Sequence, residues 1–150
     1  MESYLERAVR CFLEERKIPY QRNYNIPQLP HRKYDFFFTY QKKQCLVECD
    51  GIHHFEMVPH FDTKGNSLAA RQQADRLKTK VAIDYSYYLI RIDYTSESCI
   101  NNHLSLALQR VKTKRYYFTN PHLYTYIDRP LDKSIIINEC KDLARLLKFI

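Results

Sequence analysis

Short runs of apolar and aromatic residues recur through the first hundred positions, and each run is bounded by charged or turn-forming residues. Runs of this length and composition are typical of β-strands. They predict strands over residues 20–26, 34–40, 44–50 and 87–94. The connection between the second and third runs is short and polar, which favours an antiparallel hairpin.

Elsewhere, apolar residues recur at spacings of three and four, which is the period of an amphipathic helix. The spacing predicts helices over residues 2–17, 68–82, 101–111 and 134–150. No repeat, low-complexity tract or linker divides the chain, and its 150 residues suffice for one domain with its own core. We therefore expect a single domain over residues 1–150.

Two carboxylates stand at the end of the third predicted strand. Side chains two residues apart share a face of a strand, so Glu48 and Asp50 point the same way. Burying two acids is costly unless a cation or hydrogen-bond donors meet them. A hairpin would bring Asp35 of the preceding strand close to both, and clustered carboxylates suit Mg²⁺. The alternative is structural: Asp35 caps its strand and Glu48 pairs with a lysine.

Further polar residues flank this cluster along the chain. Ser3 followed by Glu6 is the capping-box pattern of a helix start, so Glu6 either caps the first helix or faces the acids. Arg32 and Lys33 lie in a loop directly before the Asp35 strand. They are candidates for phosphate contacts, and a solvated loop is the alternative.

The chain carries a formal charge of +7 and has a pI of about 9.1, a balance that favours nucleic acid or another polyanion as its partner. The charge is uneven, because the last fifty residues hold nine Lys/Arg against four Asp/Glu. The densest basic stretch comprises Arg110, Lys112, Lys114 and Arg115, and two tyrosines follow it directly. That combination suits a nucleic-acid backbone, with a solvated helix end as the alternative.

The five cysteines are odd in number and form no disulfide framework, and the chain shows no signal peptide and no apolar run of membrane-spanning length. These features predict a reducing, intracellular setting. Cys45, Cys49, His53 and His54 have a spacing that could suit zinc. Both cysteines fall on the apolar face of their strand, however, and no second ligand pair follows. A zinc-organised interaction protein is therefore only the third possibility.

The order of these elements resembles that of the PD-(D/E)XK restriction-like nucleases, and within them the very-short-patch-repair-like branch that includes small homing endonucleases. The Glu-x-Asp-Gly-x-x-His-Phe run is the fairly specific piece, and the others are weak when taken singly. The likeness covers residues 3–94, and its matching pieces are Ser3-x-x-Glu6, Tyr34-Asp35-Phe36, Leu46-Val47-Glu48-Cys49-Asp50-Gly51-x-x-His54-Phe55, Asp75-x-x-Lys78 and Leu89-Ile90-Arg91-Ile92.

The resemblance implies an α/β fold, with a mixed central β-sheet flanked by helices and a C-terminal helical extension. Residues 3–94 would form the catalytic core, and residues 95–150 a basic extension for DNA binding or dimerisation. It also implies a Mg²⁺-dependent deoxyribonuclease, with Mn²⁺ able to substitute, that cuts double-stranded DNA and has no membrane partner. One active site cuts one strand, so a double-strand break needs a homodimer, a higher homo-oligomer or two successive nicks.

The same resemblance implies roles for individual residues. Asp35 and Glu48 are the expected Mg²⁺ ligands, with Glu6 as a helper. The family carries a lysine two residues after the second acid, where this chain has Asp50. Asp50 is therefore a candidate catalytic acid of undecided role, either metal ligand or structural.

The missing lysine needs a replacement, and Lys78 or Lys80 on the following helix can supply the charge, with Lys78 preferred. His53 is expected to carry a proton in the reaction, and His54 is expected to be the more structural of the two. The expected contacts to the DNA backbone are Arg32, Lys33, Arg71, Lys80, Arg110, Lys112, Lys114 and Arg115.

Two other functions stay open at this point. One is a non-catalytic nucleic-acid-binding module on an inactivated nuclease fold, and the other is a mismatch-repair or restriction-type nicking nuclease. The missing lysine favours the first. The retained acids disfavour it, because a binding module gains nothing from carboxylates that face phosphate.

Overall fold

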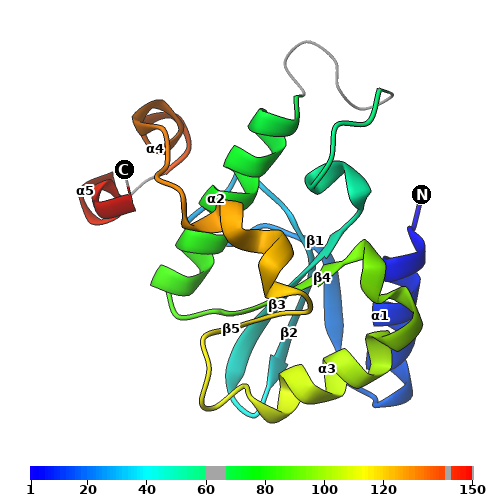
Figure 1. Ribbon diagram of the computed structural model, residues 1–150. Coiled ribbons are helices and arrows are strands. Elements are labelled where there is room, and N and C mark those ends of the chain that lie inside the picture. The colour runs from blue at the N-terminus through cyan, green and yellow to red at the C-terminus, as the bar shows by residue number, and fades with distance from the viewer. Residues whose placement is uncertain (60–66, 141–142, 150) are drawn as a thin grey trace.

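The computed structural model describes residues 1–59, 67–140 and 143–149, and its centre is a five-stranded mixed sheet (Figure 1). The first three strands form an antiparallel meander, and the last two run parallel to the third. The mixed sheet flanked by helices that the sequence predicts is confirmed. In sheet order the strands are β1 (Tyr20–Tyr24), β2 (Tyr34–Tyr40), β3 (Lys43–Asp50), β4 (Tyr88–Asp93) and β5 (Tyr116–Phe118).

Helices cover both faces of this sheet, so the core lies in two layers (Figure 1). Helices α1 (Tyr4–Glu15) and α3 (Ile100–Gln109) pack on one face, and α2 (Leu68–Asp84) packs on the other. Along β3, Cys45 and Val47 enter the first layer and Leu46 enters the second, as strand alternation requires. The second layer also holds apolar side chains of the short helices α4 (Lys133–Glu139) and α5 (Leu143–Leu146).

Short 3₁₀ segments complete the described part of the chain. They are η1 (Ile52–His54), η2 (Tyr94–Cys99), η3 (Pro121–Asp128) and η4 (Leu147–Phe149). No helix among the described residues has the length and apolar character needed to cross a bilayer.

The β2–β3 hairpin has a two-residue turn that fixes the register of the whole site. Gln41 and Lys42 have φ values of 49° and 66°, so both central residues are left-handed, as a tight hairpin turn of matching twist requires. The turn pairs Tyr40 with Lys43 and, five steps along each strand, brings Asp35 opposite Glu48. A slip of one residue would pair Asp35 with Cys49 and put Asp35 and Glu48 on opposite faces of the sheet.

Residues 100–118 belong to the same core as the strands before them. β5 joins the sheet beside β4, and α3 shares a core layer with α1. The core therefore continues past residue 94, and the helices α4 and α5 follow it along the chain. The physical reason is that α1 alone leaves one face of the sheet partly uncovered, and residues 100–118 bury the rest.

Candidate active site

The pairing of β2 with β3 ends at Phe36 and Val47. Beyond this pair, two acidic side chains connect the two strands. The main-chain N–H of Asp35 donates to Glu48 Oε1 at 3.0 Å. The N–H of Cys49 donates to Asp35 Oδ2 at 2.7 Å. Each carboxylate therefore holds the other strand's main chain, and the two acids lie side by side.

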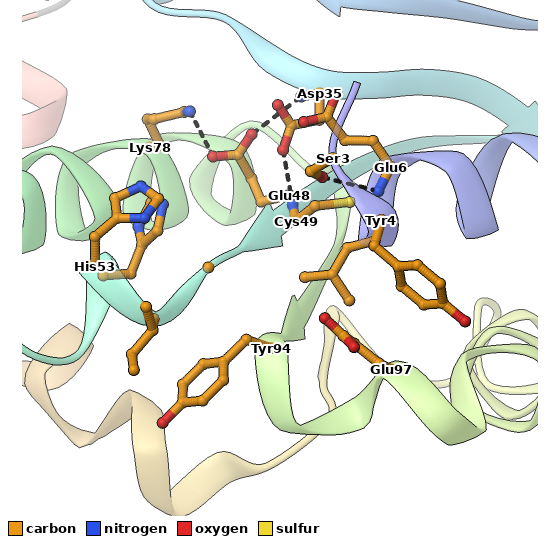
Figure 2. Close-up of a pocket in the computed structure, with 14 residues that line it drawn as sticks. Ser3, Tyr4, Glu6, Asp35, Glu48, Cys49, His53, Lys78, Tyr94 and Glu97 are labelled. Atoms are coloured by element: carbon orange, nitrogen blue, oxygen red, sulfur yellow. Dashed lines mark hydrogen bonds and ion pairs between the residues drawn. The ribbon is translucent and has the colours of Figure 1, made fainter. Parts of the chain in front are cut away.

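These acids open onto a cavity of about 590 Å³, which α1, the strand ends, η1 and α2 surround (Figure 2). Lys78 reaches in from α2, and its Nζ lies 2.5 Å from Glu48 Oε2. Tyr34 fixes this lysine twice, because its hydroxyl donates to the Lys78 carbonyl at 2.7 Å and its ring centre lies 5.1 Å from Nζ. The structure thus brings together two strands and one helix at a single charged point.

The charge of Asp35 is poorly compensated by the protein itself. Burial, reinforced by the charge of Glu48, raises the pKa of Asp35 to about 8. Among the described residues, its second oxygen, Oδ1, has no hydrogen-bond partner. Two adjacent carboxylates, one with an unused oxygen, form an all-oxygen donor set of the kind that Mg²⁺ prefers. The residues present therefore fit a hard divalent cation.

Glu6 approaches the same acids from α1 and lines the cavity beside Asp35 (Figure 2). Its N–H caps onto the Ser3 hydroxyl at 3.1 Å, so the capping pattern and the position near the acids occur together. The Glu6 carboxylate itself is held by Arg22 of β1, at 2.6 Å. Glu6 is thus available at the rim of the cavity with its charge already partly paired.

The two histidines of η1 have different environments. His53 lines the cavity, and its pKa is lowered, first by burial and then by the charges of His54 and Arg71. The ring of His54 is anchored, with Nδ1 2.8 Å from Asp75 and 3.6 Å from Asp50. Burial alone would lower the pKa of His54, but the two aspartates outweigh it and raise that pKa to about 9.

Asp50 has a different environment from the one the sequence suggests, because it does not line the cavity. Its carboxylate is 1% exposed and accepts two bonds from Arg91 Nη1, at 2.8 and 2.9 Å, and one from the Tyr124 hydroxyl at 2.8 Å. Arg91 is completely buried and also lies 3.5 Å from Asp75, which in turn accepts from Tyr126 at 2.7 Å. The hydrogen bonds of Asp50 thus support a structural role.

Asp50, His54 and Asp75 nevertheless form a possible metal-binding group. One ligand atom from each lies within 4.8 Å of the other two. Arg91 and the protonated His54 already supply two positive charges to these two aspartates, and two tyrosine hydroxyls occupy further lone pairs. A divalent ion would have to displace those cations, so we assign this group to the stability of the fold.

The anchored His54 makes stability depend on pH. The unfolded pKa is near 6.5 and the folded pKa is about 9, so the contribution of His54 is complete below pH 6.5 and is lost as the pH rises through 9. We expect His54→Gln to destabilise the protein by on the order of 2 kcal/mol at pH 6, and by much less at pH 10. Urea unfolding of both proteins at the two pH values measures this. A difference that is the same at pH 6 and pH 10 would contradict it.

Comparison with known proteins assigns no family. No family model matches the chain, and no curated protein matches it. Among solved structures it is similar to SfsA of Pyrococcus furiosus, in complex with Ca²⁺, with 11% sequence identity and a TM-score of 0.38. The similarity covers 76% of this chain and 54% of that one, so the chain spans about half the length of SfsA. A likeness this weak indicates neither a family nor an activity.

The candidate DNA contacts are scattered, and several are engaged within the protein. Arg32 pairs with Glu139 at 2.6 Å, and Lys80 donates to a carbonyl of residue 129. Arg71 lies beside the cavity, since it donates to the carbonyl of His53, a lining residue, at 2.8 Å. Lys33 is exposed.

The basic stretch 110–115 lies at the other end of the sheet from the acids. It precedes β5, whose first residue is level with Leu89, whereas Glu48 is level with Arg91 and the cavity lies beyond. In Figure 1 the segment between α3 and β5 lies at the opposite end of the strands from η1. Arg115 there donates to the carbonyl of Ile83. DNA bound at the cavity would therefore not lie directly on this stretch.

The geometry does not support the hypothesis of a zinc site that contains both Cys45 and Cys49. Cys45 and Cys49 are four residues apart on one strand, which separates them by roughly 13 Å. Cys45 is fully buried in the apolar layer. The two thiols therefore do not bind one ion together.

The sequence did not predict the three residues that bind the buried aspartates Asp50 and Asp75, namely Arg91, Tyr124 and Tyr126. Arg91 carried a usable signal, since it interrupts the apolar run Ile90–Ile92 of a strand that is buried on both faces. The tyrosines carried none, because they lie in a stretch without helical or strand periodicity.

Proposed function

We propose that the chain is a Mg²⁺-dependent endonuclease that hydrolyses phosphodiester bonds of DNA. The observation that carries the proposal is the pair Asp35 and Glu48, whose carboxylates each accept a main-chain N–H of the other strand and line one cavity, with Lys78 paired to Glu48. Among the described residues Asp35 has no ion-pair partner, and burial beside Glu48 raises its pKa, which supports a role in function rather than in stability.

Asp35 and Glu48 would hold the Mg²⁺ ion, with Glu6 near enough to assist from α1. When bound there, Mg²⁺ would polarise the scissile phosphate and neutralise the charge that develops on it. The phosphate would enter the cavity that the two acids line together with residues of α1 and η1 (Figure 2).

Lys78 would stabilise the negative charge that grows on phosphorus. Its ammonium is held by Glu48 and by the ring of Tyr34, so it needs no reorganisation during the reaction. In this proposal Lys78, on α2, supplies the positive charge that the family resemblance expects two residues after Glu48. Removing a positioned charge of this kind costs roughly 10²- to 10³-fold in rate.

His53 would take the proton from the attacking water. The pKa of its imidazole is lowered, so the ring is neutral and able to accept a proton at pH 7. Its neighbour, the protonated His54, contributes to that lowering of the pKa of His53 and does not itself accept the proton. The charges of Asp50 and Asp75 on His54 therefore keep the two rings in opposite protonation states.

DNA is the substrate class that the charge favours. The net charge of +7 attracts polyanions, and an acidic cavity that opens on such a protein acts on a phosphate only with a divalent cation between them. The resemblance to homing-type enzymes makes double-stranded DNA the first substrate to test.

The test is cleavage of supercoiled plasmid DNA in Mg²⁺ and in EDTA. We expect nicking or linearisation in Mg²⁺ alone, and a rate roughly 10²- to 10³-fold lower for Lys78→Met. Lys133→Met removes an exposed lysine at the start of α4 and serves as the matched control with an unchanged rate. Cleavage that persists in EDTA, or a Lys78→Met enzyme as fast as the control, would refute the proposal.

A further inference from the structure

The cavity has two unlike halves. Glu6, Asp35, Glu48 and Lys78 form the charged half described above. The other half is apolar and aromatic, with one acid at its edge, and Figure 2 shows Tyr4, Tyr94 and Glu97 grouped across the cavity from Lys78. The residues of this aromatic half are Tyr4, Leu5, Ile52, Tyr94 and Glu97.

The aromatic half leaves large side chains open to solvent beside a charged site. Tyr4 is 59% exposed and Ile52 is 40% exposed. The ring of Tyr94 is supported from behind by Phe55, with ring centres 5.8 Å apart. Within the described part of the chain, neither the tyrosine hydroxyls nor the Glu97 carboxylate has a hydrogen-bond partner. These groups are therefore available to a ligand.

Their positions are set by rigid elements. Tyr4 lies in the first turn of α1, whose next residue, Leu5, is buried in the core. Tyr94 and Glu97 lie on η2, which starts directly after β4 and is capped by the buried Asp93. Backbone positions set in this way, with the Tyr94 ring also supported by Phe55, reduce the conformational entropy that is lost when a ligand stacks on these tyrosines.

We infer that the aromatic half binds the base of the nucleotide next to the scissile phosphate, turned out of the duplex stack. The inference rests on the proposed function, because the phosphate of that nucleotide would lie at Asp35 and Glu48. Aromatic side chains stack on unpaired bases, and the cavity, at about 590 Å³, has room for a nucleotide. A base that stays paired and stacked in a duplex does not offer its ring face to Tyr4 or Tyr94.

Glu97 determines which base is accepted. A carboxylate only accepts hydrogen bonds when ionised, so it favours a base that presents an exocyclic amino group. Cytosine, adenine and guanine carry such a group, whereas the Watson–Crick edge of thymine has one ring N–H between two carbonyl oxygens, which a carboxylate repels. The expected substrate is therefore DNA with an unpaired or easily unpaired amino-bearing base beside the cut.

The test measures binding without metal, by fluorescence anisotropy in EDTA. The probes are a short labelled duplex with one unpaired cytosine, the same duplex with one unpaired thymine, and a fully paired duplex. We expect wild type to bind the unpaired-cytosine duplex roughly tenfold more tightly than the paired one. Tyr4→Ala and Tyr94→Ala should lose that preference, and Tyr94→Phe should keep it because the ring remains.

Tyr116→Ala is the matched control, because Tyr116 is also an exposed tyrosine (49%) but lies on β5, at the end of the sheet away from the cavity. It should keep the wild-type preference for the unpaired-cytosine duplex over the paired one. Equal preference in wild type, Tyr4→Ala and Tyr94→Ala would overturn the inference, as would a loss of preference in Tyr116→Ala. Glu97→Gln should abolish the preference for cytosine over thymine, and unchanged discrimination would overturn the role of Glu97.

The two proposals fail separately. Metal-dependent cleavage that is indifferent to Tyr4 and Tyr94 would leave the endonuclease in place and remove the base site. A cytosine preference that depends on Tyr4 and Tyr94, without cleavage of any DNA in Mg²⁺, would support the base site and remove the endonuclease.

Discussion

Asp35→Asn should abolish DNA cleavage and at the same time make the metal-free protein more stable. The variant loses a proposed metal ligand, which costs several kcal/mol of transition-state stabilisation, or roughly a 10³-fold lower rate. It keeps an oxygen that can accept the N–H of Cys49 and removes a charge that the fold opposes. Loss of activity with a gain in stability is typical of a residue kept for function.

The stability effect has a defined pH dependence. The folded pKa of Asp35, at about 8, is above its unfolded value. The folded protein is therefore most stable while Asp35 is protonated, and its free energy of unfolding falls as the pH rises through 8. In EDTA at pH 8.5, the free energy of unfolding of Asp35→Asn should therefore be roughly 1–3 kcal/mol higher than that of wild type. Urea unfolding measures it.

Mg²⁺ should reverse that order. A ligand that binds only the folded state stabilises it, so Mg²⁺ should raise the unfolding free energy of wild type and leave Asp35→Asn unchanged. Asp128→Asn, at an exposed position, is the control and should follow wild type in every measurement. A metal-free Asp35→Asn protein that is less stable than wild type would show that the carboxylate serves the fold.

Arg91→Met should be the most destabilising single substitution among the charged residues discussed. It leaves Asp50 and Asp75 buried without their shared cation, and breaking a buried pair in this way costs about 3–5 kcal/mol. Adding Asp50→Asn to Arg91→Met should recover part of the loss, because the double variant no longer buries that charge. Urea unfolding at pH 7 compares the three proteins.

The control is a surface ion pair on α1. Arg7 lies 3.7 Å from Glu2, and the Arg7 side chain is 63% exposed. Arg7→Met should cost less than about 1 kcal/mol. If Arg91→Met were no more destabilising than Arg7→Met, the buried network would not be what holds α2, β3 and η3 together.

Much of the site could be read from the sequence because its residues are close along the chain. The tight turn at Gln41 and Lys42 follows from a short polar connection between two strand patterns, and it fixes the pairing of Asp35 with Glu48. Lys78 was harder, since a helical pattern shows that the residue lies on a helix but not which strand the helix covers. Its contact with Glu48 spans 30 positions, and only tertiary packing of α2 on the sheet determines it.

The contacts that the sequence did not predict join residues that are farther apart along the chain. Tyr124 meets Asp50 across 74 positions, and Tyr126 meets Asp75 across 51. No local pattern encodes such a pair. Asp50 illustrates the consequence, because strand alternation correctly put it on the face of Glu48, yet Arg91 and Tyr124 from elsewhere in the chain decide its environment.

The most direct measurement is anomalous diffraction from crystals of the protein soaked with Mn²⁺ and a short DNA duplex. We predict a manganese peak in contact with the carboxylates of Asp35 and Glu48, with a DNA phosphate on its open side. A peak held by Asp50, His54 and Asp75, or a phosphate bound without any metal at Asp35, would contradict the account.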